Sequence, residues 1–121
     1  MKVKIDTKEK FHVITLEEAK MPANMTEGLE NTLLPYTQKE IKNVVLKLGE
    51  VIFIDENAAQ KLVQIQQAFY DNNSSFVICE LQPEVEKLLD EMEILEILNV
   101  TPTESEAWDI IQMEEIEREL F

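Results

Sequence analysis

The sequence predicts an α/β fold built on a mixed, mainly parallel β-sheet. Short apolar runs rich in Val and Ile alternate along the chain with longer stretches whose apolar residues recur every three or four positions. Strands that alternate with helices are joined by right-handed crossovers, which make their strands parallel. The first two strands follow each other without a helix, so we expect an antiparallel hairpin at the start. The 121 residues suit one domain, and we expect a single domain over residues 1–121.

The order of the predicted elements is strand, strand, helix, then three further strands that each precede a helix. The strands are predicted at residues 2–6, 11–16, 43–48 continued by 51–54, 75–79 and 97–100. The four helices are predicted at residues 24–33, 57–71, 83–92 and 104–121. In the second helix, apolar residues step by 4, 3 and 4 and indicate one buried stripe: Ala58, Leu62, Ile65 and Phe69.

Polar residues suited to helix ends mark the boundaries of these elements. Asn24 and Thr103 each stand three residues before a Glu, which is the pattern of a capping box. Asp55 follows an apolar run directly, and its carboxylate can accept backbone N–H bonds at the start of helix 57–71. Pro83 suits the first turn of the third helix, where its missing N–H is harmless.

The charge of the chain is strongly acidic and unevenly distributed. Residues 80–121 carry 14 acidic and 2 basic side chains, a net of −12, whereas residues 1–79 carry 11 and 9, a net of −2. Nucleic acid and anionic membranes are therefore poor partners, because no basic face exists to meet their charge. A basic protein surface is compatible with the acidic segment. The simpler interpretation, which we favour, is that the acids solvate the outer faces of two helices.

The chain shows no sign of export or of membrane insertion. No apolar run approaches the roughly 20 residues needed to cross a bilayer. The first residues alternate in polarity and lack the apolar stretch of a signal peptide. Cys79 is the only cysteine, so no disulfide forms within the chain. We therefore expect a cytoplasmic protein without direct membrane insertion.

Two consecutive segments resemble the core signature of the STAS domain family. Residues 43–48 read Asn-Val-Val-Leu-Lys-Leu and residues 53–59 read Phe-Ile-Asp-Glu-Asn-Ala-Ala. The family pattern is an apolar strand close to V-V-L-D-L, a short link, and then F-I-D-S-S-G-L. The family contains anti-sigma factor antagonists and the cytoplasmic domains of sulfate-type transporters. Weaker similarity continues at Gln82-Pro83-Glu84-Val85 and at residues 94–108, so the resemblance spans nearly the whole chain in element order.

Three departures from the family pattern concern charge and the phospho-acceptor position. Lys47 stands where the family usually has Asp, and Glu56 and Asn57 replace the two serines. In phospho-switched members a partner kinase phosphorylates the serine two places after the conserved Asp, which corresponds to Asn57 here. Asn57 has no hydroxyl, so the resemblance implies a binder that is constitutive or is regulated through its partner.

The resemblance implies a non-catalytic regulatory module that docks a protein partner. The implied partner is an anti-sigma factor with an ATP-binding serine-kinase fold. The implied contact surface is the loop and helix that begin at Asp55, and its residues are Asp55, Glu56, Asn57, Ala58, Lys61 and Gln64. A STAS subunit of another assembly, such as a lipid-transport or sensory complex, is the alternative within the same family.

Catalysis and cofactor binding are not expected. His12 and Cys79 are the only members of their types, which excludes the usual zinc sites and leaves only a carboxylate-based metal enzyme. Asp55 and Glu56 could in principle ligate Mg²⁺, but a helix N-terminus repels cations, so capping is the better interpretation. A homodimer is a further alternative, because Ile116, Leu120 and Phe121 are apolar residues among acids at the C-terminal end.

Overall fold

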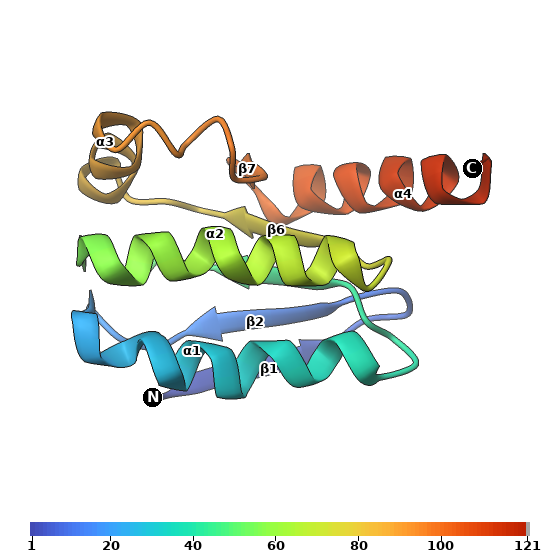
Figure 1. Cartoon of the computed structure of the whole chain (residues 1–121), viewed down its shortest axis with the longest axis horizontal. Helices are drawn as coiled ribbons and strands as arrows, with labels where there is room; N and C mark the ends of the chain where they lie inside the picture. The colour runs from blue at the N-terminus through green and yellow to red at the C-terminus, as the bar shows by residue number, and fades with distance from the viewer. Residues whose placement is uncertain (121) are drawn as a thin grey trace.

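The computed structural model describes residues 1–120 and has the α/β fold that the sequence predicts. The main sheet has five strands in the order β1-β2-β4-β6-β7, of which β1, β2, β6 and β7 are labelled in Figure 1. A second, two-stranded sheet pairs β3 with β5. The strands are β1 (Val3–Thr7), β2 (His12–Leu16), β3 (Lys20–Met21), β4 (Val44–Lys47), β5 (Phe53–Ile54), β6 (Phe76–Cys79) and β7 (Val100–Thr101). The helices are η1 (Ala23–Met25), α1 (Thr26–Leu33), η2 (Leu34–Gln38), α2 (Glu56–Asp71), α3 (Pro83–Glu91) and α4 (Glu104–Leu120), η1 and η2 being 3-10 helices.

Strand pairing confirms the expected hairpin and the parallel remainder of the sheet. β1 pairs antiparallel with β2, and β2, β4, β6 and β7 are parallel to one another. Ile14, Leu46 and Ile78 are neighbours in register across three strands. All three are buried, at 0%, 1% and 0% exposure, and they belong to the larger of two hydrophobic clusters.

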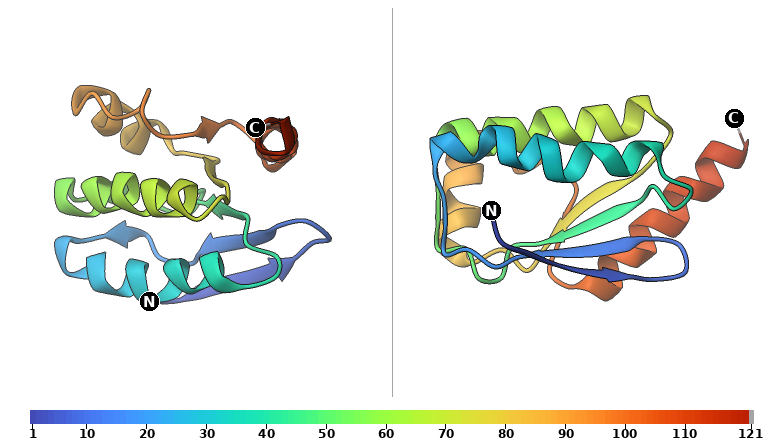
Figure 2. Two further views of the ribbon diagram at one scale, coloured as in Figure 1. Left: turned by 45° about the vertical axis from the view of Figure 1, so that its right-hand side comes forward. Right: turned by 90° about the horizontal axis from the view of Figure 1, so that it is seen from below.

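Helices cover both faces of the main sheet. α1 and α2 lie on one face and α4 lies on the other, as the right-hand view of Figure 2 shows. The apolar residues divide accordingly into two clusters. The larger lies under α1, α2 and α3, and the smaller lies between the sheet and α4 and includes Val45, Val77, Cys79, Ala107 and Ile111. Residues of a strand alternate between these two clusters because successive side chains point to opposite faces.

Helix α2 has the stripe that the spacing predicts. Ala58, Leu62, Ile65 and Phe69 are each no more than 1% exposed and pack in the larger cluster. The helix ends where Asn73 takes φ 57°, a left-handed conformation that Asn tolerates better than most residues. The helix therefore ends at Asp71, where the sequence predicts its end.

The start of α1 differs from the prediction. Asn24 is not an N-cap, because it lies inside η1, which continues directly into α1. An N-cap residue needs an extended backbone, whereas Met25, which precedes α1, has φ −85° and ψ −9°. The α-helix does end at Leu33, as predicted, but the chain then continues as η2.

Two predicted strands also need correction. The strand expected at 97–100 is β7, which holds only Val100 and Thr101, and Ile97 precedes it with 56% exposure. The run 51–54 does not extend the main sheet. Its last two residues form β5, which pairs in parallel with β3 in a segment expected to be a link. A two-residue strand has no periodicity to reveal it, and its partner lies more than 30 positions away in sequence.

Candidate partner-binding site

The β3–β5 ladder fixes the backbone that leads into α2. The amide of Ile52 donates to the carbonyl of Ala19 at 2.8 Å, and the amide of Asp55 donates to the carbonyl of Met21 at 2.8 Å. These bonds hold the two residues on either side of β5. The N-terminus of α2 is therefore positioned by a segment that precedes it by more than 30 residues.

Asp55 caps α2 as the sequence predicts. Its backbone is extended, with φ −77° and ψ 149°, and its Oδ1 accepts a hydrogen bond from the amide of Asn57 at 2.7 Å. One of the free N–H groups of the first turn is thereby satisfied. Glu56 is exposed in the same turn, where the positive end of the helix dipole favours a carboxylate.

The remaining predicted contact residues differ in how accessible they are. Asn57 and Gln64 are exposed. Ala58 is 0% exposed and packs in the core, so its side chain supports the helix. Lys61 forms an ion pair with Glu30 of α1 and donates to Oε1 of Gln64 at 2.8 Å. The solvent-facing part of the predicted set therefore consists of Glu56, Asn57 and Gln64, beside a Lys61 already paired within the chain.

Two apolar residues that sequence reasoning placed in a buried strand lie on the surface beside Asp55. Ile52 is 57% exposed and Phe53 is 49% exposed, while Val51 and Ile54 are at most 2% exposed. A run of four apolar residues does not show which of them face solvent, because β5 is paired on one side only by another two-residue strand. No signal in the sequence identified this pair as surface residues.

A groove of about 320 Å³ separates these apolar residues from α3. Ile52 and Phe53 form one wall, and Leu88 of α3 contributes an apolar side chain to the other. The rim is charged, and its residues are Glu84, Lys87 and Glu91. The groove therefore combines apolar walls with charged residues close to the N-terminus of α2.

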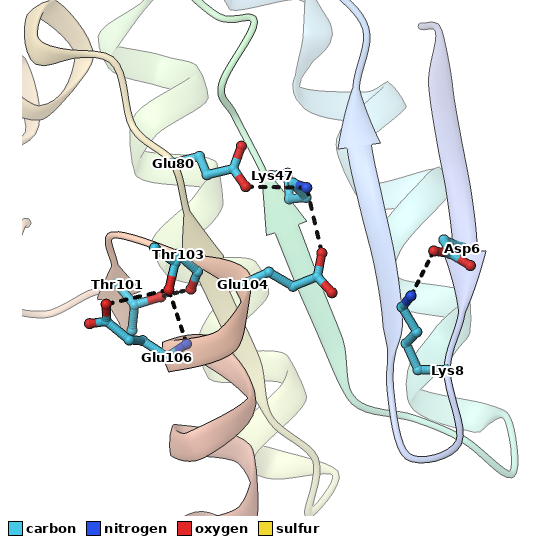
Figure 3. A network of polar contacts seen from close by, with 8 residues as sticks. All are labelled: Asp6, Lys8, Lys47, Glu80, Thr101, Thr103, Glu104 and Glu106. Carbon is cyan, nitrogen blue, oxygen red and sulfur yellow. Dashed lines mark hydrogen bonds and ion pairs between the residues drawn. The ribbon is translucent and has the colours of Figure 1, made fainter.

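Lys47 makes its contacts on the opposite face of the sheet. Its Nζ lies 3.2 Å from Oε2 of Glu80 and 3.5 Å from Oε1 of Glu104 (Figure 3). The ammonium group thus joins the end of β4 to the residue after β6 and to the first turn of α4. The hydrogen bond that Lys47 donates to Glu80, with the charges of both carboxylates, raises the pKa of Lys47 although partial burial opposes it. The substitution of Lys for the usual Asp therefore has a structural role here.

The histidine and the cysteine are both occupied by structural roles. The ring of His12 has nitrogens 2.8 Å from Oγ1 of Thr7 and 2.9 Å from the carbonyl of Ile41. Cys79 is fully buried, and burial raises the pKa of its thiol to about 12. Among residues 1–120, no three His, Cys, Asp or Glu side chains are grouped so as to hold a metal ion. None of the helices described is long and apolar enough to span a bilayer.

The family model of the STAS domain matches residues 2–107. The chain belongs to the STAS domain family. The match covers every strand of both sheets and the three helices that pack on the larger core. No curated protein matches this STAS domain in sequence.

Solved structures of other proteins share the fold at low sequence identity. A proposed anti-sigma factor antagonist from Thermotoga maritima is 19% identical over 91% of this chain and 94% of its own, with a TM-score of 0.71. RsbS from Moorella thermoacetica, in a form with serine replaced by glutamate, is 20% identical over 98% and 99%, with a TM-score of 0.75. The mouse anion transporter Slc26a9 is 14% identical over 86% of this chain but only 18% of its own, with a TM-score of 0.71. These structures thus share the fold of this STAS domain.

Proposed function

We propose that this STAS domain is a non-catalytic binding module of the anti-sigma factor antagonist type. Its docking surface is the N-terminal part of α2 together with the groove between β5 and α3. The partner is a protein, and an anti-sigma factor with a serine-kinase fold is the candidate that the family resemblance favours.

The exposure of Ile52 and Phe53 is the observation that carries this proposal. Large apolar side chains that are about half exposed cost free energy in water, by about 25 cal/mol for each Å² left uncovered. Both side chains border the groove whose other wall includes Leu88. Covering them with a partner removes that cost, and the neighbouring exposed residues Glu56 and Asn57 add polar contacts at the rim.

The polar residues of the site orient the partner in this proposal. Asp55 holds the first turn of α2 through its bond to the amide of Asn57. Gln64 lies two turns further along the same helix, and Lys61 between them is held by Glu30. The groove rim carries Glu84, Glu91 and Lys87. The net negative rim favours a partner surface that presents a basic residue beside its apolar anchor.

A STAS subunit of a transport or sensory assembly is the second candidate. The fold similarity to part of the mouse anion transporter Slc26a9 supports it. The replacement of the serines by Glu56 and Asn57 favours it as well, because such a subunit needs no phosphate switch. Both candidates use a protein contact surface, and they differ in the class of partner recovered.

The test is capture of partners on the immobilised full chain, with a paired variant and control. The double substitution Ile52→Ser with Phe53→Ser removes the apolar wall. The control Ile97→Ser removes an equally exposed side chain, 56% against 57% for Ile52. Ile97 lies far from the proposed surface, because its backbone carbonyl accepts a hydrogen bond from Gln66 of α2. Gln66 follows Glu56 by ten residues, or about 15 Å along the helix axis.

We expect the native chain and the control to recover the same partner, identified by mass spectrometry as an anti-sigma factor. The double variant should lose at least about tenfold in affinity for the purified partner, or 1.4 kcal/mol. Recovery of a membrane transporter or sensor instead would favour the second candidate. Equal affinity of all three chains for the partner would overturn the docking surface. Circular dichroism and thermal unfolding verify that each variant is folded.

A further inference from the structure

The C-terminal helix α4 has a second apolar surface that faces away from the protein. On its inner side, Ala107 and Ile111 are 0% exposed and pack against the sheet. On its outer side, Met113, Ile116 and Leu120 are 54%, 58% and 73% exposed. These three residues, named here the outer stripe, are spaced by 3 and 4 positions. A helix turns by about 100° per residue, so they lie on one line nearly opposite Ile111.

The outer stripe is part of a helix that extends beyond the rest of the fold. The last turns of α4 reach past the end of α2 and past the turn of the β1–β2 hairpin (Figure 1, and the right-hand view of Figure 2). No described residue of the chain covers the stripe, since its three side chains are more than half exposed. Single exposed apolar residues are common, but three on one helical line form a continuous surface of about 10 Å in length.

The borders of the outer stripe are acidic. α4 carries seven acidic residues and one basic residue, so its net charge is 1 − 7 = −6. Asp109 continues the line of the stripe toward the N-terminus, and Glu117 and Glu119 flank it on either side; all three are exposed. Arg118, the single basic residue, is turned to the inner side, where it donates to Oγ of Ser75 at 3.1 Å.

These charges decide between the occupants that could cover the stripe. A second copy of α4 would place the exposed acids that border the stripe, Asp109, Glu117 and Glu119, close to the same acids of its partner, and like charges across an interface cost free energy. An anionic membrane surface is repelled for the same reason. A basic helix with apolar residues at the same spacing would fill the stripe and pair its Lys or Arg side chains with the acidic borders.

We propose that the outer stripe of α4 binds a basic amphipathic helix of a partner protein. This contact is separate from the docking surface at Asp55. α4 runs antiparallel to β4, because Lys47 at the end of β4 bonds Glu104 while Asn43, just before β4, bonds Glu115 at 2.7 Å. The outer stripe therefore lies at the end of the sheet where β4 begins, opposite the end that holds the N-terminus of α2. Both surfaces can be occupied together.

The probe for this proposal is a synthetic peptide of Leu and Lys of about 18 residues, or five helical turns, with Leu on one face. Its fluorescence anisotropy is followed during titration with the full chain at physiological ionic strength. A scrambled peptide of the same composition, which has no apolar face, is the charge control. We expect saturable binding of the amphipathic peptide and at least about tenfold weaker binding of the scrambled one.

Paired variants separate the stripe from the charges. Ile116→Ser with Leu120→Ser should weaken binding about tenfold or more. The matched apolar control, Ile5→Ser with Ile97→Ser, removes side chains of 48% and 56% exposure elsewhere and should leave binding unchanged.

For the charges, Asp109→Asn with Glu117→Gln should weaken binding and reduce its salt dependence. The control removes two acids from α3, by Glu86→Gln with Asp90→Asn, and should weaken binding and reduce its salt dependence to a smaller extent. Equal binding by the stripe variant and the native chain would overturn the proposal, as would equal binding of both peptides.

Sedimentation of the free chain is the last arm of the test. A monomer is expected. A dimer that Ile116→Ser with Leu120→Ser dissociates would show that a second copy covers the stripe, and this result would also overturn the proposal. These positions are exposed, so thermal unfolding of the variants should stay close to that of the native chain.

Discussion

The hydroxyl group of Tyr70 on α2 donates a hydrogen bond to Oε2 of Glu114 on α4 at 2.7 Å. The two helices lie on opposite faces of the sheet, so this bond joins the two layers around the sheet edge. Nδ2 of Asn99, the residue before β7, donates to the same Oε2 at 3.0 Å. Oε1 of Glu114 is buried and has no hydrogen-bond partner among residues 1–120. The carboxylate thus depends on donors to one of its two oxygens.

Substitution of Tyr70 should destabilise the fold. Tyr70→Phe removes a donor from a carboxylate that already has one unpartnered oxygen, and we expect a loss of about 1–3 kcal/mol of unfolding free energy. Glu114→Gln removes the charge, so the same Tyr70→Phe change should cost less in that background. Denaturant unfolding of the four chains of this double-mutant cycle measures the difference. A coupling near zero would contradict the importance of the bond.

The stability should also depend on Lys47 in a pH-dependent way. In the folded state, Glu80 and Glu104 raise the pKa of Lys47 above its ordinary value of 10.5. The charged lysine therefore stabilises the fold at any pH where it is charged in both the folded and the unfolded chain. That contribution is complete below pH 10.5 and is lost as the pH rises through the higher folded pKa. Lys47→Met should therefore lower the unfolding free energy at neutral pH, by about 0.5–1 kcal/mol for such a partly exposed pair.

The pH dependence separates the loss of charge from a loss of packing. The difference between the native chain and Lys47→Met should shrink in unfolding measurements above pH 10.5. A difference that stays constant across this range would assign the effect to the aliphatic part of the side chain. Lys42→Met, which removes a lysine that donates to the backbone carbonyl of Asn72 at 3.0 Å, is the control.

The cap at Asp55 supports both the fold and the candidate site. Asp55→Ala removes the acceptor of the Asn57 amide and should cost about 1 kcal/mol of unfolding free energy. Asp55→Asn keeps an acceptor oxygen and should cost much less. Equal losses for the two variants would show that the carboxylate charge, and not the cap bond, stabilises the start of α2.

Ionic strength should change the melting temperature. The chain has a net charge of −14, and α4 alone has seven acids against one base. At about 0.15 M salt, charges more than about 8 Å apart are screened, so repulsion among these acids weakens. We expect a rise of about 3–6 °C between low and moderate sodium chloride, or about 1 kcal/mol for a domain of this size. A constant melting temperature would show that the acids are too dispersed to repel.

The parts of the fold that were predictable are those in which one segment of sequence decides its own structure. The buried stripe of α2 depends on local spacing, and the Asp55 cap depends on residues two positions apart. The cap predicted at Asn24 failed because a 3-10 turn precedes α1 there. No residue pattern near Asn24 predicts that turn.

The candidate site was only partly predictable for the same reason. Its polar residues on α2 follow from the family resemblance, whereas Ile52 and Phe53 do not. Their exposure depends on the pairing of β5 with β3, and the groove beside them depends on where α3 packs. Both are contacts between segments far apart in sequence, and local apolar patterns do not encode them. The ion pairing of Lys61 with Glu30 was missed on similar grounds.

Phosphorylation is the sharpest test of how this STAS domain differs from the switched members of its family. Asn57 lies in the first turn of α2, is exposed, and has no hydroxyl to accept a phosphate. Glu56 supplies a carboxylate one residue earlier, but adjacent helix positions point in different directions, so it does not replace a phosphate at position 57. Ser74 and Ser75 are 0% exposed and follow the other end of α2. The native chain should therefore gain no phosphate when incubated with ATP and a kinase that phosphorylates STAS domains.

Asn57→Ser should restore the acceptor in this setting. The backbone there is already helical and the side chain faces solvent, so the variant should fold like the native chain and gain the mass of one phosphate. The phosphate would add between one and two negative charges beside Ile52 and Phe53 and should weaken partner binding. Asn57→Ala is the matched control and should bind the partner with or without ATP. A stoichiometric gain of one phosphate by the native chain would contradict the constitutive mode of binding.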